Sequence, residues 1–199
     1  MKKNNQVRIG CLLMAAGNAS RFRTNKLLVD FDGKPLVQRA MEAIARDRFA
    51  EIVVVTQYPD VTHMAQEFGY TCIQNDHPEW GAAYTIRLGT EALRRCNAIM
   101  YMVADQPLLE DVSVERLVDV WREHPCNIIA PSHDGRTGNP CIFPREFYDE
   151  LMALEGDVGG KAVIRRHMDK LLTVELAAQE LVDCDTPEAL RRLKQEAKE

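Results

Sequence analysis

The stretch CLLMAAGNASRFRTNKLL, residues Cys11 to Leu28, decides how the rest of the chain is interpreted. An apolar run over about 7–16 predicts a buried strand, and the chain then enters a small polar loop at Gly17. Two cations follow, Arg21 and Lys26, five residues apart. Glycine lets backbone N–H groups face an anion, and the cations add positive charge. The alternative is a simple turn with two solvated cations. The loop matches neither the P-loop pattern nor the dinucleotide-binding glycine pattern.

The composition predicts one globular α/β domain over residues 1–199, with residues 1–6 as a flexible tail. Apolar residues make up 46% and charged residues 28% of the chain, which are ordinary values. A net charge of −5 disfavours nucleic-acid binding. No apolar run reaches the roughly 20 residues that span a bilayer, so we expect no membrane association. The first apolar run also resembles a short secretory signal, but Arg8 interrupts it, and the cytoplasm is the expected location.

The six cysteines are scattered, without a C-x-x-C pair or a close histidine partner. This pattern disfavours a zinc site and a disulfide scaffold and predicts reduced, partly buried thiols.

Apolar, β-rich runs alternate with helical patterns, which predicts a mainly parallel sheet covered by helices. Residues 133–144 hold two glycines and two prolines and predict a loop with irregular β structure. The expected strands are 7–16, 51–57, 71–75, 98–107, 127–132, 171–174 and 181–184. The expected helices follow Pro35 and cover about 61–69, 81–96, 112–123, 145–154 and 160–168, with a last one from Pro187.

Three aspartates stand where strands are expected to end. Asp105 follows a strongly apolar run, and Pro107 ends the expected strand. Ligands of open parallel sheets bind outside the carboxyl ends of the strands, and a carboxylate there suits a divalent cation that bridges phosphates. Asp183 and Asp185 project to the same side of an extended segment, and like charges so placed require a cation or donor. The alternative for Asp105 and Asp185 is helix capping.

Three glycine-bearing stretches complete the pattern: TGNPCIF at 137–143, GDVGGKAVIRR at 156–166 and WGAAYTIRLG at 80–89. The first predicts a tight bend. The other two each place glycine before a helix whose free N–H groups can receive an anion. A solvated basic face is the alternative for the cations of 161–166.

Taken together and in order, these motifs resemble the molybdenum cofactor cytidylyltransferase family, a branch of the nucleotidyltransferases related to molybdopterin guanylyltransferases. The motifs run from Cys11 to Leu190, nearly the whole chain. The resemblance implies a three-layer Rossmann-like fold with a mainly parallel mixed sheet. It also implies a Mg²⁺-dependent transfer of CMP from CTP to the molybdopterin-bound molybdenum cofactor, with release of pyrophosphate.

The resemblance assigns roles to residues by position. Arg21, Lys26 and Asp105 would be catalytic, and Asp105 would bind magnesium with Asp183 or Asp185. Ala16 before Gly17 favours CTP over GTP. The nucleotide-binding set is Ala15, Ala16, Gly17, Asn18, Ser20, Arg21, Lys26 and Arg87. The substrate-binding set is Gly138, Asn139, Pro140, Asp157 and Gly159.

Other functions fit the same fold. One alternative is a nucleotidyltransferase that uses GTP, or that acts on a sugar or polyol phosphate. Another is a non-catalytic carrier that delivers the cofactor to a molybdenum hydroxylase. Arg23, close to the position where related loops have a glycine, keeps the carrier open. The retained Arg21, Lys26 and Asp105 favour an enzyme.

Overall fold

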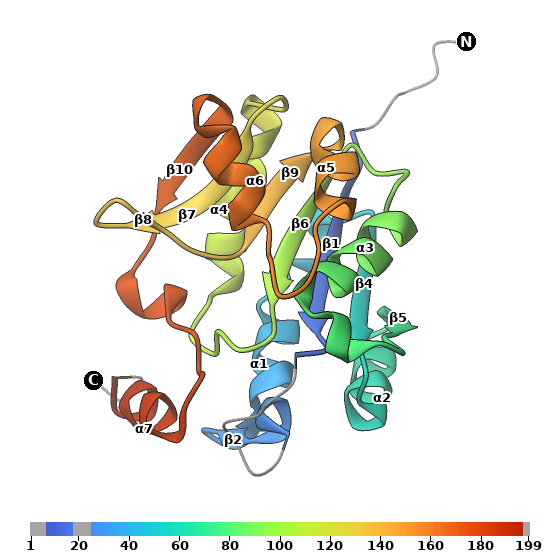
Figure 1. The fold of residues 1–199 in the computed structure, drawn as a ribbon. Helices are drawn as coiled ribbons and strands as arrows, with labels where there is room; N and C mark the ends of the chain where they lie inside the picture. Colours follow the sequence, from blue (N-terminus) through green and yellow to red (C-terminus); the bar gives the residue numbers. More distant parts are fainter. Residues whose placement is uncertain (1–6, 18–24, 197–199) are drawn as a thin grey trace.

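The computed structural model describes residues 7–17 and 25–196, and its centre is one mixed β-sheet (Figure 1). The strands are β1 (Ile9–Ala15), β4 (Glu51–Thr56), β5 (Thr71–Gln74), β6 (Ala98–Val103), β7 (Ile128–His133), β8 (Arg136–Thr137), β9 (Cys141–Pro144) and β10 (Leu171–Glu175). Their order across the sheet is β10-β7-β9-β6-β1-β4-β5, with β8 paired to β7. The expected mainly parallel mixed sheet is confirmed.

Strand β1 lies in the middle and pairs in parallel with β4 and β6. Six of its seven residues are buried, because helices cover both faces of the sheet and apolar side chains are needed on both. Two strands depart from the parallel order: β9 runs antiparallel between β6 and β7, and the short β8 runs antiparallel to β7. The sequence analysis predicted a loop with irregular β structure for this segment.

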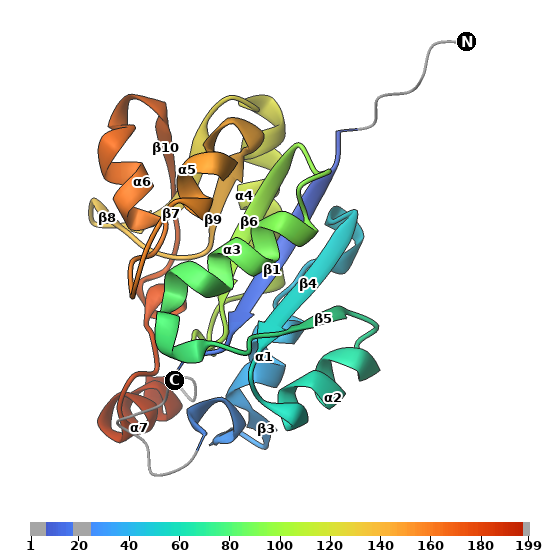
Figure 2. The same ribbon diagram turned by 45° about the vertical axis from the view of Figure 1, so that its right-hand side comes forward.

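Two layers of helices cover the sheet (Figures 1 and 2). Helices α1 (Leu36–Glu42), α2 (Pro59–Glu67) and α4 (Asp111–Glu123) pack on one face, and their apolar residues share a core with Leu13 of β1. Helices α3 (Ala82–Ala92), α5 (Tyr148–Met152) and α6 (Lys161–Arg166) pack on the other face with Leu12. The fold is therefore the three-layer α/β/α architecture that the sequence predicted.

The last helix, α7 (Pro187–Glu196), belongs to a small third core below the main sheet. Its Leu193 packs with Phe31 and Leu36 near a hairpin of β2 (Asp30–Phe31) and β3 (Lys34–Pro35). The strand expected at 181–184 is not formed. Residues 178–181 form a short 3₁₀ helix, and the Cys184 N–H donates instead to the Asp105 carbonyl at 2.8 Å.

All six cysteines lie in the described part of the chain and are free thiols, four of them buried. Within residues 7–17 and 25–196, no helix is both long and apolar enough to cross a bilayer.

Candidate active site

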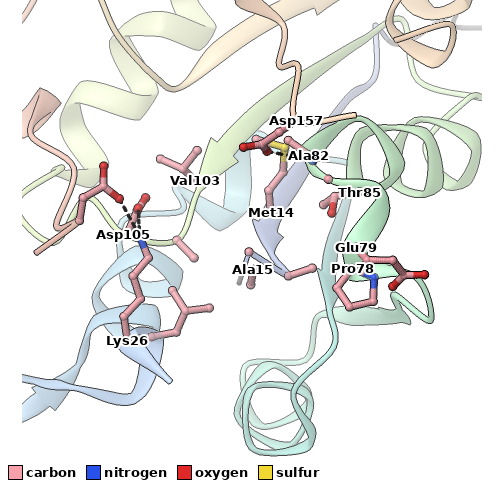
Figure 3. A pocket seen from close by; sticks show the side chains of 16 residues that line it. Met14, Ala15, Lys26, Pro78, Glu79, Ala82, Thr85, Val103, Asp105 and Asp157 are labelled. Carbon is pink, nitrogen blue, oxygen red and sulfur yellow. Dashed lines mark hydrogen bonds and ion pairs between the residues drawn. The ribbon is translucent and has the colours of Figure 1, made fainter. Parts of the chain in front are cut away.

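An open cavity of about 550 Å³ lies where β1 and β6 end (Figure 3). Met14 pairs with Val103 in the parallel register, so the loops after these two strands leave the sheet at the same edge. The cavity is lined from β1 by Met14 to Gly17, from β6 by Val103 to Asp105, and by Lys26, Leu27, Pro78, Glu79, Gly81, Ala82, Thr85, Asp157 and Asp185. Figure 3 shows Lys26 and Asp105 at one end and Pro78 and Glu79 at the other.

Lys26 and Asp105 form the polar centre of the cavity. The Lys26 ammonium is 2.6 Å from Asp105 Oδ2 and 2.9 Å from Asp185 Oδ1. The side chains of Lys26 and Asp105 are only 15% and 16% exposed, whereas that of Asp185 is 53% exposed. Burial alone favours a neutral lysine, but the two carboxylates outweigh it and raise the pKa of Lys26. The ammonium therefore stays charged and occupies the space between two carboxylates.

The local backbone structure sets the position from which the Lys26 side chain starts. Lys26 begins a short 3₁₀ helix, Lys26–Leu28, and the Asn25 side chain caps this turn by accepting a hydrogen bond from the Leu27 N–H at 3.1 Å. Capping by asparagine satisfies a backbone donor that the turn leaves free. The lysine side chain thus starts from a defined backbone position at the cavity edge.

Asp183 lies beside this pair without lining the cavity. Asp183 is exposed as a residue, but its Oδ1 accepts a hydrogen bond from the buried Gln106 Nε2 at 3.0 Å. Removal from water and the negative charges of Asp105 and Asp185 raise the pKa of Asp183 to about 6. The local excess of negative charge indicates a place for more positive charge than Lys26 supplies.

The residues fit a divalent cation, since carboxylate oxygens are the ligands that hard cations take. These carboxylates do not form a complete set of ligands. Within the described residues, ligand atoms of three His, Cys, Asp or Glu side chains lie within 4.8 Å of one another only at His133, Asp134 and Glu175. This group is exposed or half-buried and lies at the β7–β8 turn. At the cavity the Lys26 ammonium stands between Asp105 and Asp185 instead, and a cation held by these two carboxylates would take its place.

The start of the β1 loop is fixed by three consecutive side chains at the end of β4, Thr56 to Tyr58. The carbonyl of Ala15 accepts from Thr56 Oγ1 at 2.9 Å and that of Ala16 from Gln57 Nε2 at 2.8 Å. Tyr58 Oη donates to the Gly17 carbonyl at 3.0 Å. With these carbonyls occupied, the backbone path into the loop is set. The sequence analysis missed this triplet, although polar residues directly after an apolar strand were a usable signal.

The N-terminus of α3 is closed by the segment that carries the GDVGG motif. Asp157 Oδ1 accepts from the Ala82 N–H at 3.3 Å, and the Gly156 carbonyl accepts from the Ala83 N–H at 3.1 Å. Gly81 allows this contact, because it has φ +78° and a Cβ there would lie 2.5 Å from the Gly156 backbone. Two of the N–H groups that the sequence offered to an anion therefore already have partners.

Other predicted site residues fall into three groups. Asp157 lines the cavity and caps α3, while Gly159 does not line it. Gly138, Asn139 and Pro140 precede β9 and do not line it either. Because Cys141 pairs with Tyr101 in the antiparallel register, they extend toward the carboxyl end of β6. Asn18, Ser20 and Arg21, together with Arg23, lie outside the described residues, as does the predicted tail 1–6.

Arg87 is not where the sequence analysis expected it. It lines a separate hollow of about 260 Å³ with Trp80 and Tyr84, and not the cavity that Lys26 and Asp105 line. The reason is helical phase. Ala82 and Thr85 are three residues apart and face the cavity, whereas Arg87 is two residues beyond Thr85 and points about 200° around the helix from it.

Lys26 and Asp105 thus meet over the carboxyl edge of a mixed α/β sheet, beside this cavity. Residues 11–171 match the model of the MobA-like NTP transferase domain, and the chain belongs to that family.

The chain is also similar to curated proteins. The 3-deoxy-manno-octulosonate cytidylyltransferase of Neisseria meningitidis serogroup A is 25% identical over 125 residues, which cover 62% of this chain and 49% of that protein. The chain thus spans about half the length of the curated relatives that it matches.

Solved structures share the fold. Rv0371c from Mycobacterium tuberculosis H37Rv has a TM-score of 0.80 at 22% identity, covering 95% of this chain and 98% of its own. Its manganese complex has a TM-score of 0.77 at 22% identity, covering 95% and 99%. Molybdopterin-guanine dinucleotide biosynthesis protein A from Archaeoglobus fulgidus has a TM-score of 0.67 at 17% identity, covering 95% and 98%.

Proposed function

We propose that this protein transfers CMP from CTP to the terminal phosphate of molybdopterin in the molybdenum cofactor, with Mg²⁺ as metal. The observation that carries this proposal is the meeting of Lys26 and Asp105 at the edge where β1 and β6 end. The cavity beside them, about 550 Å³, is within the usual range of small-molecule sites. Membership of the NTP transferase family supports the reaction type.

The chain supplies position and charge for the reaction. A phosphate oxygen of the acceptor attacks the α-phosphorus of CTP, a new P–O bond forms, and the bond to the β-phosphate breaks to release pyrophosphate. Such transfers depend mainly on alignment and on neutralising charge. Backbone groups of Ala15, Ala16 and Gly17 would hold the base and sugar. Lys26 would turn to the triphosphate and offset the charge of the departing pyrophosphate.

Asp105 and Asp185 would hold the metal, with Asp183 beside them. A bound Mg²⁺ supplies Lewis-acid charge to the phosphate oxygens. With Asp105 and Asp185 engaged in holding Mg²⁺, the Lys26 ammonium would be free to contact phosphate. The same lysine would therefore offset the charges of the two carboxylates before binding and stabilise the phosphates afterwards. Arg21 is proposed to assist it.

The preference for CTP comes from the resemblance, through Ala16 before Gly17. The cytidylyltransferase relative supports CTP, and the guanine dinucleotide protein among the structural neighbours keeps GTP as the competing nucleotide. We place the reaction in the cytoplasm, with a transient complex that delivers the product to a molybdenum hydroxylase.

The test is pyrophosphate release. With Mg²⁺, CTP and the molybdenum cofactor, we expect turnover by the wild type and none by Asp105→Ala, whose fold is checked by circular dichroism. Undiminished release by Asp105→Ala would contradict the site. Pyrophosphate release with GTP in place of CTP would show that GTP is the nucleotide substrate.

A second acceptor is favoured by one observation, the similarity to the 3-deoxy-manno-octulosonate enzyme. Sugar acids, sugar phosphates and polyol phosphates should therefore be assayed in parallel with radiolabelled CTP. Labelling of a sugar acceptor would replace the molybdopterin assignment. Tight cofactor binding without turnover, together with a stable hydroxylase complex, would indicate the carrier.

A further inference from the structure

Gln106 follows the proposed metal ligand Asp105 directly and is 2% exposed. A buried amide is unusual in this position, because glutamine side chains are mostly exposed. The transfer reaction described above does not use it. Its contacts therefore need their own explanation.

The side-chain amide of Gln106 joins two segments that are far apart in the sequence. Its Nε2 donates to Asp183 Oδ1 at 3.0 Å and to the Leu181 carbonyl at 3.4 Å. The backbone adds one further link, since the Cys184 N–H donates to the Asp105 carbonyl at 2.8 Å. Gln106 and its neighbour thus fasten the segment that carries Asp183 to the end of β6.

The orientation of this amide is determined by its partners. A carboxylate and a carbonyl only accept hydrogen bonds, so the nitrogen of Gln106 must face them. The oxygen, Oε1, then points away and is buried without a hydrogen-bond partner among residues 7–17 and 25–196. Leaving a buried acceptor unpaired is unfavourable. The bonds on the nitrogen side must outweigh this cost for the side chain to stay.

Asp183 needs such a restraint. The negative charges of Asp105 and Asp185 act on it, and repulsion would turn an unrestrained carboxylate toward water. Among residues 7–17 and 25–196, Lys26 is the cation whose charge acts on Asp183, and its ammonium contacts Asp105 and Asp185 within 3 Å. Gln106 is the neutral donor that keeps Asp183 beside the other two.

We propose that Gln106 is a positioning residue that holds the Asp183 carboxylate next to the divalent-cation site of Asp105 and Asp185, where its negative charge strengthens cation binding. The assignment rests on the proposed function, since it requires that the aspartates bind a cation. Hydrogen bonds to metal ligands from the surrounding shell commonly change metal affinity by about 10–100-fold, which sets the expected size of the effect.

The experiment is a titration with Mn²⁺ alone, followed by electron paramagnetic resonance. Gln106→Met keeps the length of the side chain and removes its hydrogen bonds, and we expect it to weaken Mn²⁺ binding by about 10–100-fold. The matched control is Thr90→Val, which removes a buried hydroxyl bonded to Ile86 and Tyr101 and should leave Mn²⁺ affinity unchanged. Equal affinity of Gln106→Met and wild type would overturn the proposal.

A double-mutant cycle separates positioning from a general structural effect. If Gln106 acts through Asp183, then Gln106→Met adds nothing to Mn²⁺ affinity in a protein that already carries Asp183→Asn. Fully additive losses would overturn the assignment. If Gln106→Met does not melt cooperatively, Gln106→Asn replaces it. This variant withdraws the amide by one methylene and should also weaken binding, so that unchanged affinity would again overturn the proposal.

The two levels of inference fail differently. If the wild type does not bind Mn²⁺, the cation site of the proposed function is wrong, and the role of Gln106 falls with it. If the wild type binds Mn²⁺ and Gln106→Met binds it with the same affinity, the cation site stands and the role of Gln106 is wrong.

Discussion

At the scale of single residues, Lys26 is the side chain on which the site depends. Its ammonium contacts two carboxylates, and both it and Asp105 are largely buried. The Lys26 ammonium occupies the position between the two carboxylates that the proposed divalent cation would take. We therefore expect the metal and the lysine to compete for this position, and the displaced lysine to contact phosphate.

Lys26→Met should destabilise the metal-free protein by about 1–3 kcal/mol, because it leaves Asp105 buried without a counter-ion. Mg²⁺ should stabilise this variant more than it stabilises the wild type, since the cation fills the vacated position. Urea unfolding with and without Mg²⁺ measures both effects.

The control for that measurement is Lys34→Met, which breaks an exposed pair with Glu42. It should change the free energy of unfolding by less than about 1 kcal/mol. Equal stabilisation of Lys26→Met and wild type by Mg²⁺ would contradict the exchange of lysine for metal.

Asp183 predicts a pH dependence in the metal-free protein. Its pKa is about 6 when folded, against an ordinary value of 3.8. The folded state therefore binds the proton more tightly, and this carboxyl's contribution to stability is full below about pH 4 and is lost as the pH rises through about 6. Asp183→Asn removes the charge and keeps an oxygen for Gln106, so it should stabilise the metal-free protein more at pH 7.5 than at pH 4.5. Urea unfolding at the two pH values measures this, and an equal difference at both would refute it.

At the scale of elements, two contacts place the cavity walls: the 156–157 segment on α3 and the β4 end on the β1 loop. Neither is one of the backbone hydrogen bonds that join the strands. Both join chain segments that are about 40 or more residues apart. They convert loops at a sheet edge into surfaces with a fixed shape.

Gly81→Ala should destabilise the protein by about 2–5 kcal/mol. The backbone conformation at Gly81, φ +78° and ψ −169°, is one that other residues rarely adopt, and the new Cβ would meet the Gly156 backbone. Gly159→Ala is the matched control, since a Cβ at Gly159 meets nothing within 4 Å. Thermal unfolding of both variants gives the comparison, and equal melting temperatures would show that the contact is unimportant.

Thr56→Val should weaken the grip on the β1 loop. The buried Thr56 hydroxyl donates to the Ala15 carbonyl and accepts from the Tyr58 N–H at 3.1 Å. Leaving these groups unpaired costs about 1–3 kcal/mol, and the looser loop should raise KM for CTP more than it lowers kcat. Thr173→Val, at an exposed position in β10, should change neither. Steady-state kinetics with varied CTP decides, and an unchanged KM in Thr56→Val would contradict a role for this contact.

At the scale of the whole molecule, the sequence predicted the features that depend on local pattern. Apolar runs ending in Gly17 and Asp105 placed the two strand ends correctly, since ligands of parallel sheets gather at that edge. The sequence analysis did not predict the side of the helix on which Arg87 lies. It also predicted a strand at 181–184, where the segment instead makes hydrogen bonds to Asp105 and Gln106. The antiparallel β9, the Thr56 contact and the Gln106 contact join residues distant in sequence, which a single chain's local pattern does not specify.

The whole molecule is proposed to be a CTP- and Mg²⁺-dependent enzyme, and calorimetric titration with CTP tests this. With Mg²⁺ present, the wild type should bind CTP more tightly than GTP, ATP or UTP, and Asp105→Asn should lose this binding while it remains folded. Asp149→Asn, an exposed aspartate paired with Arg94, should bind CTP like the wild type. Binding of CTP by Asp105→Asn with wild-type affinity, or no binding of any nucleotide by the wild type, would contradict a triphosphate site between Lys26 and Asp105.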